Sequence, residues 1–296
     1  MHIEEWSTRW LRMQRLKPRT RESYESLLRL YILPTMGRIE LARLSADAIQ
    51  AAIAAPLAAD HGRTAEQLYT LLVQLFRAAV RAGHIQASPM DAILRPYHVP
   101  TPTAWWAPED AARFLRLRQL ALDPHIVVWV IALCCGLRRG ELCGLRWDDI
   151  DLQQCIITVA RQRITLADGR TVAAPPKSRS SARTLAIPAD LSAWLADHRP
   201  GTGGYVAISA TTGRPITPGG LDSAWRRAVH AAGMPPITLH GCRHTCGAAA
   251  VRAGVAMRVL QDIMGHSTDA ITSKIYAHVD QQAQRQALDS ITGLMI

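Results

Sequence analysis

The sequence predicts a mainly α-helical protein of two domains, with a small antiparallel β-sheet in the second. Its 296 residues, 48% of them hydrophobic, are enough for two cores of ordinary size. Residues 1–95 read as amphipathic helices, and strand-like runs begin only at Ile156. Between them, the stretch RPYHVPTPTAWW holds three prolines and no periodic pattern. We therefore expect a helical domain over residues 1–95, a linker over 96–106 and a second domain over 107–296.

The first domain reads as four helices. Trp6 and Trp10 mark the first, and the second follows Pro18 with Thr20 as its N-cap. Pro34 and Gly37 are expected to break this second helix. Ser45 caps a third helix over Ala46–Ala55. The capping box Thr64–Gln67 opens a fourth helix, which ends at Gly83.

A cluster of basic residues lies where the second of these helices begins. Its members are Arg15, Lys17, Arg19 and Arg21. Backbone N–H groups and side-chain cations act together on phosphate at such a place. A solvated surface is the more ordinary explanation for four such charges.

The second domain opens with a helix from Pro108, whose Glu109 and Asp110 suit the helix dipole. A strongly apolar helix follows over His125–Cys135 and ends at Gly136. Three strands follow, over Ile156–Val159, Thr171–Ala173 and Thr184–Ile187. We expect them in one sheet, with a turn at Asp168–Gly169 and a basic loop over Pro175–Ser181. Two further helices are expected over Pro188–His198 and Leu221–Ala232, the second with Trp225 facing inward.

Residues 238–278 gather side chains whose spacing ordinary packing does not require. Thr238 caps a helix that runs to about Ala253 and stops at Gly254, which places His240 and Arg243 on one helix face. A second helix, from about Val255 to Met264, ends at Gly265, and His266 follows it directly. A third helix, capped by Ser267, Thr268 or Asp269, carries Tyr276.

This set of side chains fits chemistry on a phosphate. A guanidinium matches the non-bridging oxygens of a phosphate, and a phenol becomes a nucleophile when cationic or basic groups assist its deprotonation. The ordinary alternative is that the two histidines cap helices, Tyr276 fills a core and Arg243 faces solvent.

Composition limits the partners and the compartment. A formal net charge of +10 and a pI near 9.8 favour a polyanionic partner, although a membrane surface or solubility alone would give the same balance. The sequence has no run of about 18 apolar residues and no secretory h-region, so we expect a soluble, cytoplasmic protein. Of the basic residues only Lys17, Lys177 and Lys274 are lysines.

The six cysteines are expected to be reduced and buried rather than disulfide-bonded. Cys242 and Cys246 lie near His240 and His244, which suggests a zinc site as an alternative. The absence of a C-x-x-C pair argues against it, and no metal is expected.

Four motifs together resemble the tyrosine recombinase (phage-type integrase) family. They are G-L-R-R-G-E-L at Gly136–Leu142 with the following L-R-W, P-K-S at Pro176–Ser178, H-x-x-R at His240–Arg243, and G-H at Gly265–His266 with Y-x-H at Tyr276–His278. The departures are Cys242 and Met264, where leucine is usual, and Ala182, which interrupts the basic turn. The resemblance covers about residues 133–280, with every expected position filled in order.

The resemblance implies a role for each matched residue. Arg138 and Arg243 bracket the scissile phosphate, and Tyr276 attacks it to form a 3′-phosphotyrosine. His240 accepts a proton, His266 donates a hydrogen bond, Lys177 protonates the leaving 5′ oxygen and Glu141 supports Arg138. Arg139 is the adjacent basic residue, and Arg179 and Arg183 flank Lys177 as further DNA-binding residues. No metal, ATP or other cofactor is implied.

The resemblance also implies partners and architecture. The first domain looks like the SAM-like core-binding domain of phage integrases, and with the catalytic domain it would form a C-shaped clamp on duplex DNA. An amphipathic tail over Gln282–Leu294 would pack into a neighbouring protomer, so we expect a homo-oligomer that is a tetramer on DNA. The sequence shows no separate arm-binding domain, since Trp6 already belongs to the helical one.

Two rival functions remain open from the sequence. A type IB topoisomerase shares the chemistry but relaxes DNA without pairing two sites. A catalytically silent DNA-binding accessory protein would keep the fold, although the intact Tyr276, Arg138, Arg243 and Lys177 argue against it.

Overall fold

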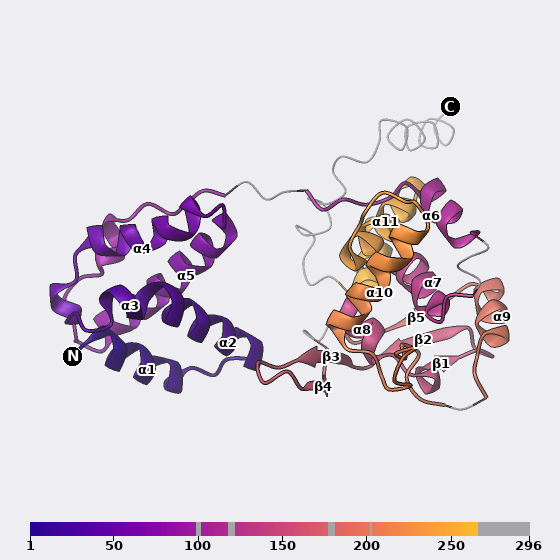
Figure 1. The fold of residues 1–296 in the computed structure, drawn as a ribbon, viewed down its shortest axis with the longest axis horizontal. Helices are drawn as coiled ribbons and strands as arrows, with labels where there is room; N and C mark the ends of the chain where they lie inside the picture. The colour runs from indigo at the N-terminus through magenta and orange to yellow at the C-terminus, as the bar shows by residue number, and fades with distance from the viewer. Residues whose placement is uncertain (99–101, 118–121, 177–180, 202, 266–296) are drawn as a thin grey trace, which may run out of the picture. The chain divides into compact units, whose positions relative to one another are not determined.

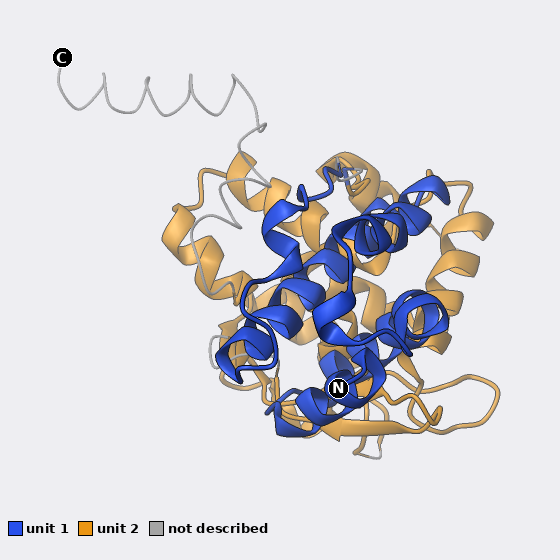
Figure 2. Cartoon of the chain, turned by 90° about the vertical axis from the view of Figure 1, so that its left-hand side faces the viewer, with its two compact units in different colours: residues 1–102 blue, residues 103–296 orange. Residues whose placement is uncertain are grey.

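The structure is a computed structural model that describes residues 1–98, 102–117, 122–176, 181–201 and 203–265 (Figure 1). The chain divides into two compact units, Met1–Pro102 and Thr103–Ile296, which Figure 2 distinguishes by colour. The boundary falls within the stretch predicted as a linker. Each unit has a hydrophobic core of its own.

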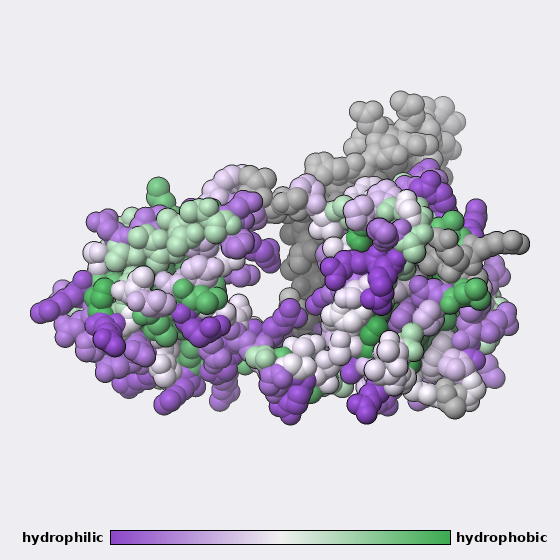
Figure 3. Space-filling view, viewed as in Figure 1, coloured by the Kyte–Doolittle hydropathy of each residue, from purple (hydrophilic) through white to green (hydrophobic). Residues whose placement is uncertain are grey.

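In the described part of the first unit, all regular elements are helical. Its elements are α1 (Ile3–Met13), α2 (Pro18–Leu27), a π-helical turn (Leu28–Ile32), α3 (Leu33–Met36), a 3-10 turn (Leu41–Arg43), α4 (Ala46–Ala58), α5 (Gly62–Arg81) and a 3-10 turn (Pro89–Ala92). The long helix α5 buries Leu68, Leu72 and Phe76 at helical spacing. Trp6 of α1 packs into the same core and donates its indole N–H to the Leu75 carbonyl at 3.1 Å. The outer face of α4 is alanine-rich and forms a pale green patch in Figure 3.

Two predicted helix starts in this unit are wrong, and one is confirmed. Thr20 is not a cap, because α2 begins at Pro18, whose missing N–H and fixed φ suit a first helical position. The Thr64–Gln67 box lies inside α5, which already begins at Gly62. Ser45 does cap α4, since its hydroxyl accepts from the Ala48 amide at 3.2 Å.

The predicted break at Pro34 is also wrong. The chain instead continues through the π-helical turn into α3, with the proline in the first turn of that helix, where a missing N–H costs little. Gly37 then ends α3, as expected.

The second unit combines helices with two small sheets. Its helices are α6 (Pro108–Leu115), α7 (Ile126–Cys135), α8 (Arg139–Gly144), α9 (Ala189–Asp197), α10 (Pro218–Ala231), α11 (Leu239–Arg252) and α12 (Met257–Met264), with a 3-10 turn at Trp147–Asp149. Its strands are β1 (Ile150–Asp151), β2 (Ile156–Val159), β3 (Gln162–Thr165), β4 (Thr171–Ala174) and β5 (Arg183–Ala186). The fold class, mainly helical with small antiparallel sheets, is therefore confirmed.

The strands form two antiparallel sheets rather than the single sheet predicted. One has the order β1-β2-β5, with Ile157 opposite Leu185, and the other is the hairpin β3-β4, with Ile164 opposite Val172. Strand β3 packs on α8 so closely that a Cβ at Gly144 would lie 2.9 Å from the Gln162 Cα. The sequence did not indicate β1, which has two residues, or β3, which shows no apolar alternation.

Aromatic side chains hold the helices of this unit together. The rings of Trp106, Phe114 and Trp129 surround Trp225 of α10, with centroid separations of 5.1 to 5.5 Å from it. The Trp225 indole donates to the Ile237 carbonyl at 2.7 Å, which ties α10 to the residues just before α11. Trp225 therefore faces inward, as predicted, and supports the start of α11.

The cysteines follow the prediction only in part. All six are free thiols; Cys135, Cys143, Cys242 and Cys246 are buried, Cys155 is half-buried and Cys134 is exposed. Cys134 was expected to be buried, but it lies at the last turn of α7, on the side away from the core. The described residues hold no group of His, Cys, Asp and Glu able to bind a metal ion, and none of their helices is long and apolar enough to cross a membrane.

Candidate active site

Helix α11 presents His240 and Arg243. The Thr238 hydroxyl accepts from the Gly241 amide at 3.1 Å, and Gly254 adopts φ +74° just past the end of the helix, so the predicted cap and stop are both confirmed. Arg243 is 3% exposed, whereas His240 reaches the surface. The Arg243 side chain is therefore almost fully enclosed by protein groups.

Arg138 stands immediately before α8. Helix α7 ends at Gly136 in the left-handed conformation, with φ +63°, which turns the chain toward α8. The Glu141 carboxylate accepts from the Arg138 backbone amide at 3.0 Å and from its Nη1 at 2.8 Å. Glu141 is 3% exposed, so a buried carboxylate holds the arginine at the start of the helix.

Arg138 and Arg243 meet at the end of α12. Arg243 donates to the Gly136 carbonyl at 2.7 Å and also to the Met264 carbonyl. Arg138 donates through Nη2 to the next carbonyl, that of Gly265, at 2.8 Å. Two guanidinium groups that lie 105 positions apart in the sequence are thus bound to consecutive carbonyls.

Charge and burial set the protonation of this site. Burial raises the pKa of Glu141, but Arg183 and Arg138 outweigh it and hold the pKa below its ordinary value. The pKa of His240 is lowered by partial desolvation, then by Arg243 and Arg138. Both shifts favour a charged Glu141 and a neutral His240 near pH 7. A neutral imidazole is the form that accepts a proton.

His244 lies one turn further along α11. Its ring meets that of His240 edge to face, with centroids 4.7 Å apart. Burial, His240 and Arg243 lower its pKa to about 4. His244 is therefore a neutral packing partner of His240 at physiological pH.

Arg183 does not lie where the sequence suggested. It was predicted to contact DNA, but its side chain is only 7% exposed and binds Glu141, which places it beneath Arg138. Charged side chains are ordinarily at the surface, and the distant partners Glu141 and the Ile263 carbonyl satisfy this buried guanidinium.

Other predicted DNA-binding residues also have protein partners. Arg139 forms an ion pair with Asp222 of α10 and stays partly exposed. Arg21 donates to the Leu11 and Gln14 carbonyls, both at 2.9 Å, and so joins α2 to the end of α1.

The remaining basic residues of that cluster, Arg15, Lys17 and Arg19, are exposed. The predicted residues Lys177, Arg179, His266 and Tyr276 lie outside the described residues.

Sequence reasoning missed Ser181. Its hydroxyl lies 3.3 Å from Arg138 Nη1, and the residue is 1% exposed. Its only signal was a place in a serine-rich loop, which gives no indication of burial.

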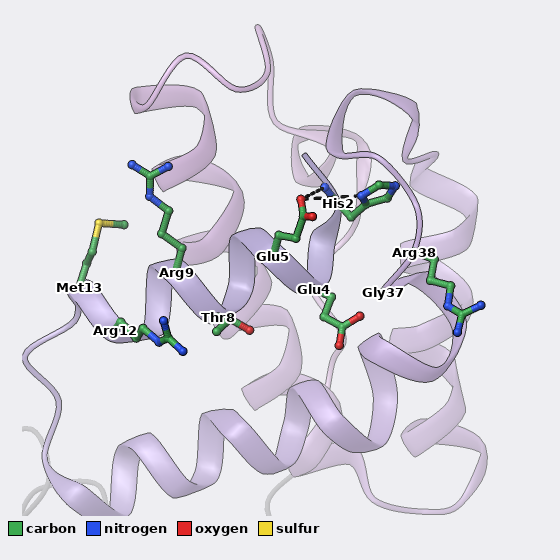
Figure 4. A pocket seen from close by; sticks show the side chains of 9 residues that line it. All are labelled: His2, Glu4, Glu5, Thr8, Arg9, Arg12, Met13, Gly37 and Arg38. Carbon is green, nitrogen blue, oxygen red and sulfur yellow. Dashed lines mark hydrogen bonds and ion pairs between the residues drawn. The ribbon is translucent and has the colours of Figure 1, made fainter.

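The first unit has a pocket of its own beside α1. Its lining includes Arg9, Arg12 and Arg38 together with Glu4 and Glu5, as Figure 4 shows. Glu5 accepts a hydrogen bond from the His2 amide at 3.0 Å. The mixed charges distinguish the pocket from a uniformly positive phosphate site.

Comparison with known proteins extends these findings. Residues 117–283, more than half of the chain, match the model of the Phage integrase family, and residues 2–55 match that of the phage integrase N-terminal SAM-like domain. A tyrosine recombinase XerC-like protein of Caldanaerobacter subterraneus is 29% identical over 57% of this chain, which spans about half (49%) of that relative's length. A putative prophage phiRv2 integrase of Mycobacterium tuberculosis is 26% identical over 95% of this chain and 76% of the relative.

Solved structures show the same fold. The Tn1549 transposon integrase in complex with transposon right end DNA superposes with a TM-score of 0.82 at 22% identity, covering 99% of this chain and 100% of that one. A lambda integrase tetramer bound to a Holliday junction gives a TM-score of 0.70 at 18% identity, covering 93% and 77%. Both units of the chain are included in these matches.

Proposed function

The chain belongs to the phage integrase family, and from that premise we propose that it is a site-specific DNA recombinase. It cleaves and rejoins DNA strands through a covalent 3′-phosphotyrosine. The observation that carries this proposal is the convergence of Arg138 and Arg243 on the consecutive carbonyls of Met264 and Gly265. Two preorganised guanidinium groups at one point suit the charge that builds on a phosphate in the transition state.

In the proposed reaction the Tyr276 phenolate attacks the scissile phosphorus. A P–O bond to tyrosine forms and the P–O5′ bond breaks, so one phosphodiester replaces another and no nucleotide cofactor is consumed. His240, neutral near pH 7, receives the phenol proton. Lys177 gives a proton to the leaving 5′ oxygen, and His266 donates a hydrogen bond to a non-bridging oxygen. A 5′ hydroxyl of a partner strand then reverses the step and exchanges strands.

The partners follow from this chemistry and from the relatives. We propose duplex DNA with specific sites as the substrate, held by the first unit through Arg15, Lys17 and Arg19 and by the catalytic unit through Arg139 and Arg179. Strand exchange needs two paired sites, and a lambda integrase is a tetramer on a Holliday junction. We therefore propose a homotetramer on DNA, acting in the cytoplasm, where such DNA is found.

Covalent capture tests the proposal and identifies the DNA site in the same experiment. The probe is a pool of nicked duplexes with a randomised region, incubated with the full chain and recovered after denaturing washes. The nick lets the cleaved fragment diffuse away, so a covalent complex accumulates and its sequence reveals the site.

Matched variants make the result decisive. Tyr276→Phe should lose all covalent capture while band-shift binding stays within about twofold. Covalent complexes formed by that variant would place the nucleophile elsewhere, and no capture by the unaltered chain would reject the proposal. Relaxation of supercoiled DNA without exchange between two sites would instead point to a type IB topoisomerase.

A further inference from the structure

Three arginines converge on the last turn of α12. The carbonyls of Ile263, Met264 and Gly265 each accept from a different guanidinium, those of Arg183, Arg243 and Arg138 in that order. The last carbonyls of a helix have no intrahelical partner and carry its negative dipole end, so cations stabilise them. The Gly265 backbone, with φ +60°, ends the helix at this point.

Arg183 is a nearly buried member of the network below Arg138. Its Nε donates to the Ile263 carbonyl at 2.7 Å, and its Nη1 donates to the Ser181 carbonyl at 3.1 Å. Both Nη atoms lie 3.2 Å from Glu141 Oε2. The side chain is 7% exposed, and its three nitrogens all donate to protein groups.

Glu141 connects Arg183 to Arg138. One carboxylate oxygen accepts from Arg138 Nη1, and the other accepts from the Arg138 backbone amide and from Arg183. Removal of either cation would leave the buried carboxylate partly unsatisfied, which is costly and moves its neighbours.

The backbone at Arg183 belongs to a sheet. It is the first residue of β5 and pairs with Val159 of β2 in the antiparallel ladder, so its Cα position is set by the sheet. Because the sheet sets the backbone of Arg183 and the guanidinium bonds to Glu141 and the Ile263 carbonyl, the side chain holds these two groups in a defined position.

We propose that Arg183 is a positioning residue for cleavage: it orients Arg138 through Glu141 and holds the end of α12 against which Arg138 and Arg243 are aligned. This inference rests on the proposed recombinase function. It replaces the sequence-based interpretation of Arg183 as a DNA contact.

The two interpretations differ in what a substitution changes. A DNA contact contributes to affinity and to its salt dependence, by a slope of about 0.9 for each phosphate neutralised. A positioning residue acts on the maximal rate, because a misplacement of about 1 Å at the reacting groups can cost roughly 100-fold.

The experiment is Arg183→Lys in the full chain, with Arg252→Lys as the matched control. Both arginines form an ion pair with a glutamate, but Arg252 and its partner Glu109 are exposed, at 51% and 63% of their side chains. Covalent capture of a nicked duplex under single-turnover conditions, at increasing DNA concentration, separates the saturating rate from the half-saturating concentration.

Arg183→Lys should lower the saturating rate by about 10- to 100-fold and leave the half-saturating DNA concentration and its salt slope within about twofold. Arg252→Lys should match the unaltered chain in both quantities. A weaker affinity with a shallower salt slope would restore the DNA-contact interpretation, and an unchanged rate would remove any role for Arg183. If the unaltered chain captures no DNA, the recombinase function fails rather than the positioning role.

A double variant tests the route through Glu141. If Arg183 acts through that carboxylate, Arg183→Lys combined with Glu141→Gln loses less rate than the product of the two single losses. Losses that multiply in full would overturn this route.

If Arg183→Lys does not fold, Arg183→Met with Glu141→Met removes both buried charges together, a change that cores often tolerate. That protein should melt cooperatively, bind the duplex and cleave it slowly. Cleavage at the rate of the unaltered chain would overturn the proposal.

Discussion

Replacing Gly241 by alanine should destabilise the catalytic unit, because the segment Ala104–Trp106 crosses the first turn of α11 at this residue. A Cβ at position 241 would lie 2.4 Å from the Ala104 carbonyl oxygen and 3.1 Å from the Ile237 Cβ. The segment is not free to retreat. The Trp106 amide donates to the Thr245 hydroxyl at 2.9 Å, and its indole donates to the Pro235 carbonyl at 2.8 Å.

The magnitude follows from two opposing terms. Forcing an extra methyl into a packed site costs about 1–3 kcal/mol, whereas alanine in place of glycine gains up to about 1 kcal/mol of helix propensity. We expect a net loss of about 1–2 kcal/mol, which for a domain of this size lowers Tm by roughly 3–6 °C.

The control is Gly219→Ala in the first turn of α10. Among the described residues no atom lies within 4 Å of where its Cβ would stand, so only the propensity gain applies and Tm should rise slightly. Calorimetry of the full chain resolves the transition of the catalytic unit. A Gly241→Ala protein that melts at or above the temperature of the unaltered chain would refute the close contact between Ala104 and α11.

Two further predictions concern pH and DNA affinity. The folded pKa of His244 is about 4, below the ordinary 6.5, so the unfolded state binds more protons in acid and stability falls as the pH drops from 6.5 toward 4. At pH 5 this loss is about 2 kcal/mol, and His244→Gln should shrink the fall in Tm between pH 7 and pH 5; an equal fall would contradict the shift. Arg19→Ala should weaken DNA binding and reduce the salt slope by about 0.9 at constant Tm, whereas Arg21→Ala, which removes the bonds to Leu11 and Gln14, should lower Tm. If the two variants change DNA affinity and Tm by the same amounts in band-shift and melting assays, the assignment of Arg19 to DNA and of Arg21 to the fold is wrong.

Several features that local sequence determines were predicted correctly, although Thr20, the Thr64–Gln67 box and the break at Pro34 were not. Thr238 and Ser45 cap helices through bonds three residues away, and Gly136 and Gly265 end helices in a conformation that glycine favours. These features depend on neighbours within one turn. They therefore leave a pattern that can be read along the chain.

The parts that depend on distant partners were not predictable in this way. Arg183 and Arg19 have the same side chain, and both stand in basic, polar stretches. Arg183 is buried because Glu141, 42 positions earlier, and the end of α12, 80 positions later, meet it in the folded chain. No pattern in the sequence around Arg183 indicates either partner.

Backbone carbonyls make the site suitable for an anion. The Glu141 carboxylate serves Arg138 and Arg183, while the Met264 and Gly136 carbonyls hold Arg243. A carboxylate cancels a positive charge, but a carbonyl satisfies an N–H donor and leaves the charge in place. The Arg243 guanidinium, held by these carbonyls, needs little reorganisation when a phosphate arrives. A second carboxylate beside Arg138, as in Ser181→Asp, would also accept from its Nη1 and should slow cleavage, because it adds negative charge where the transition state requires positive charge.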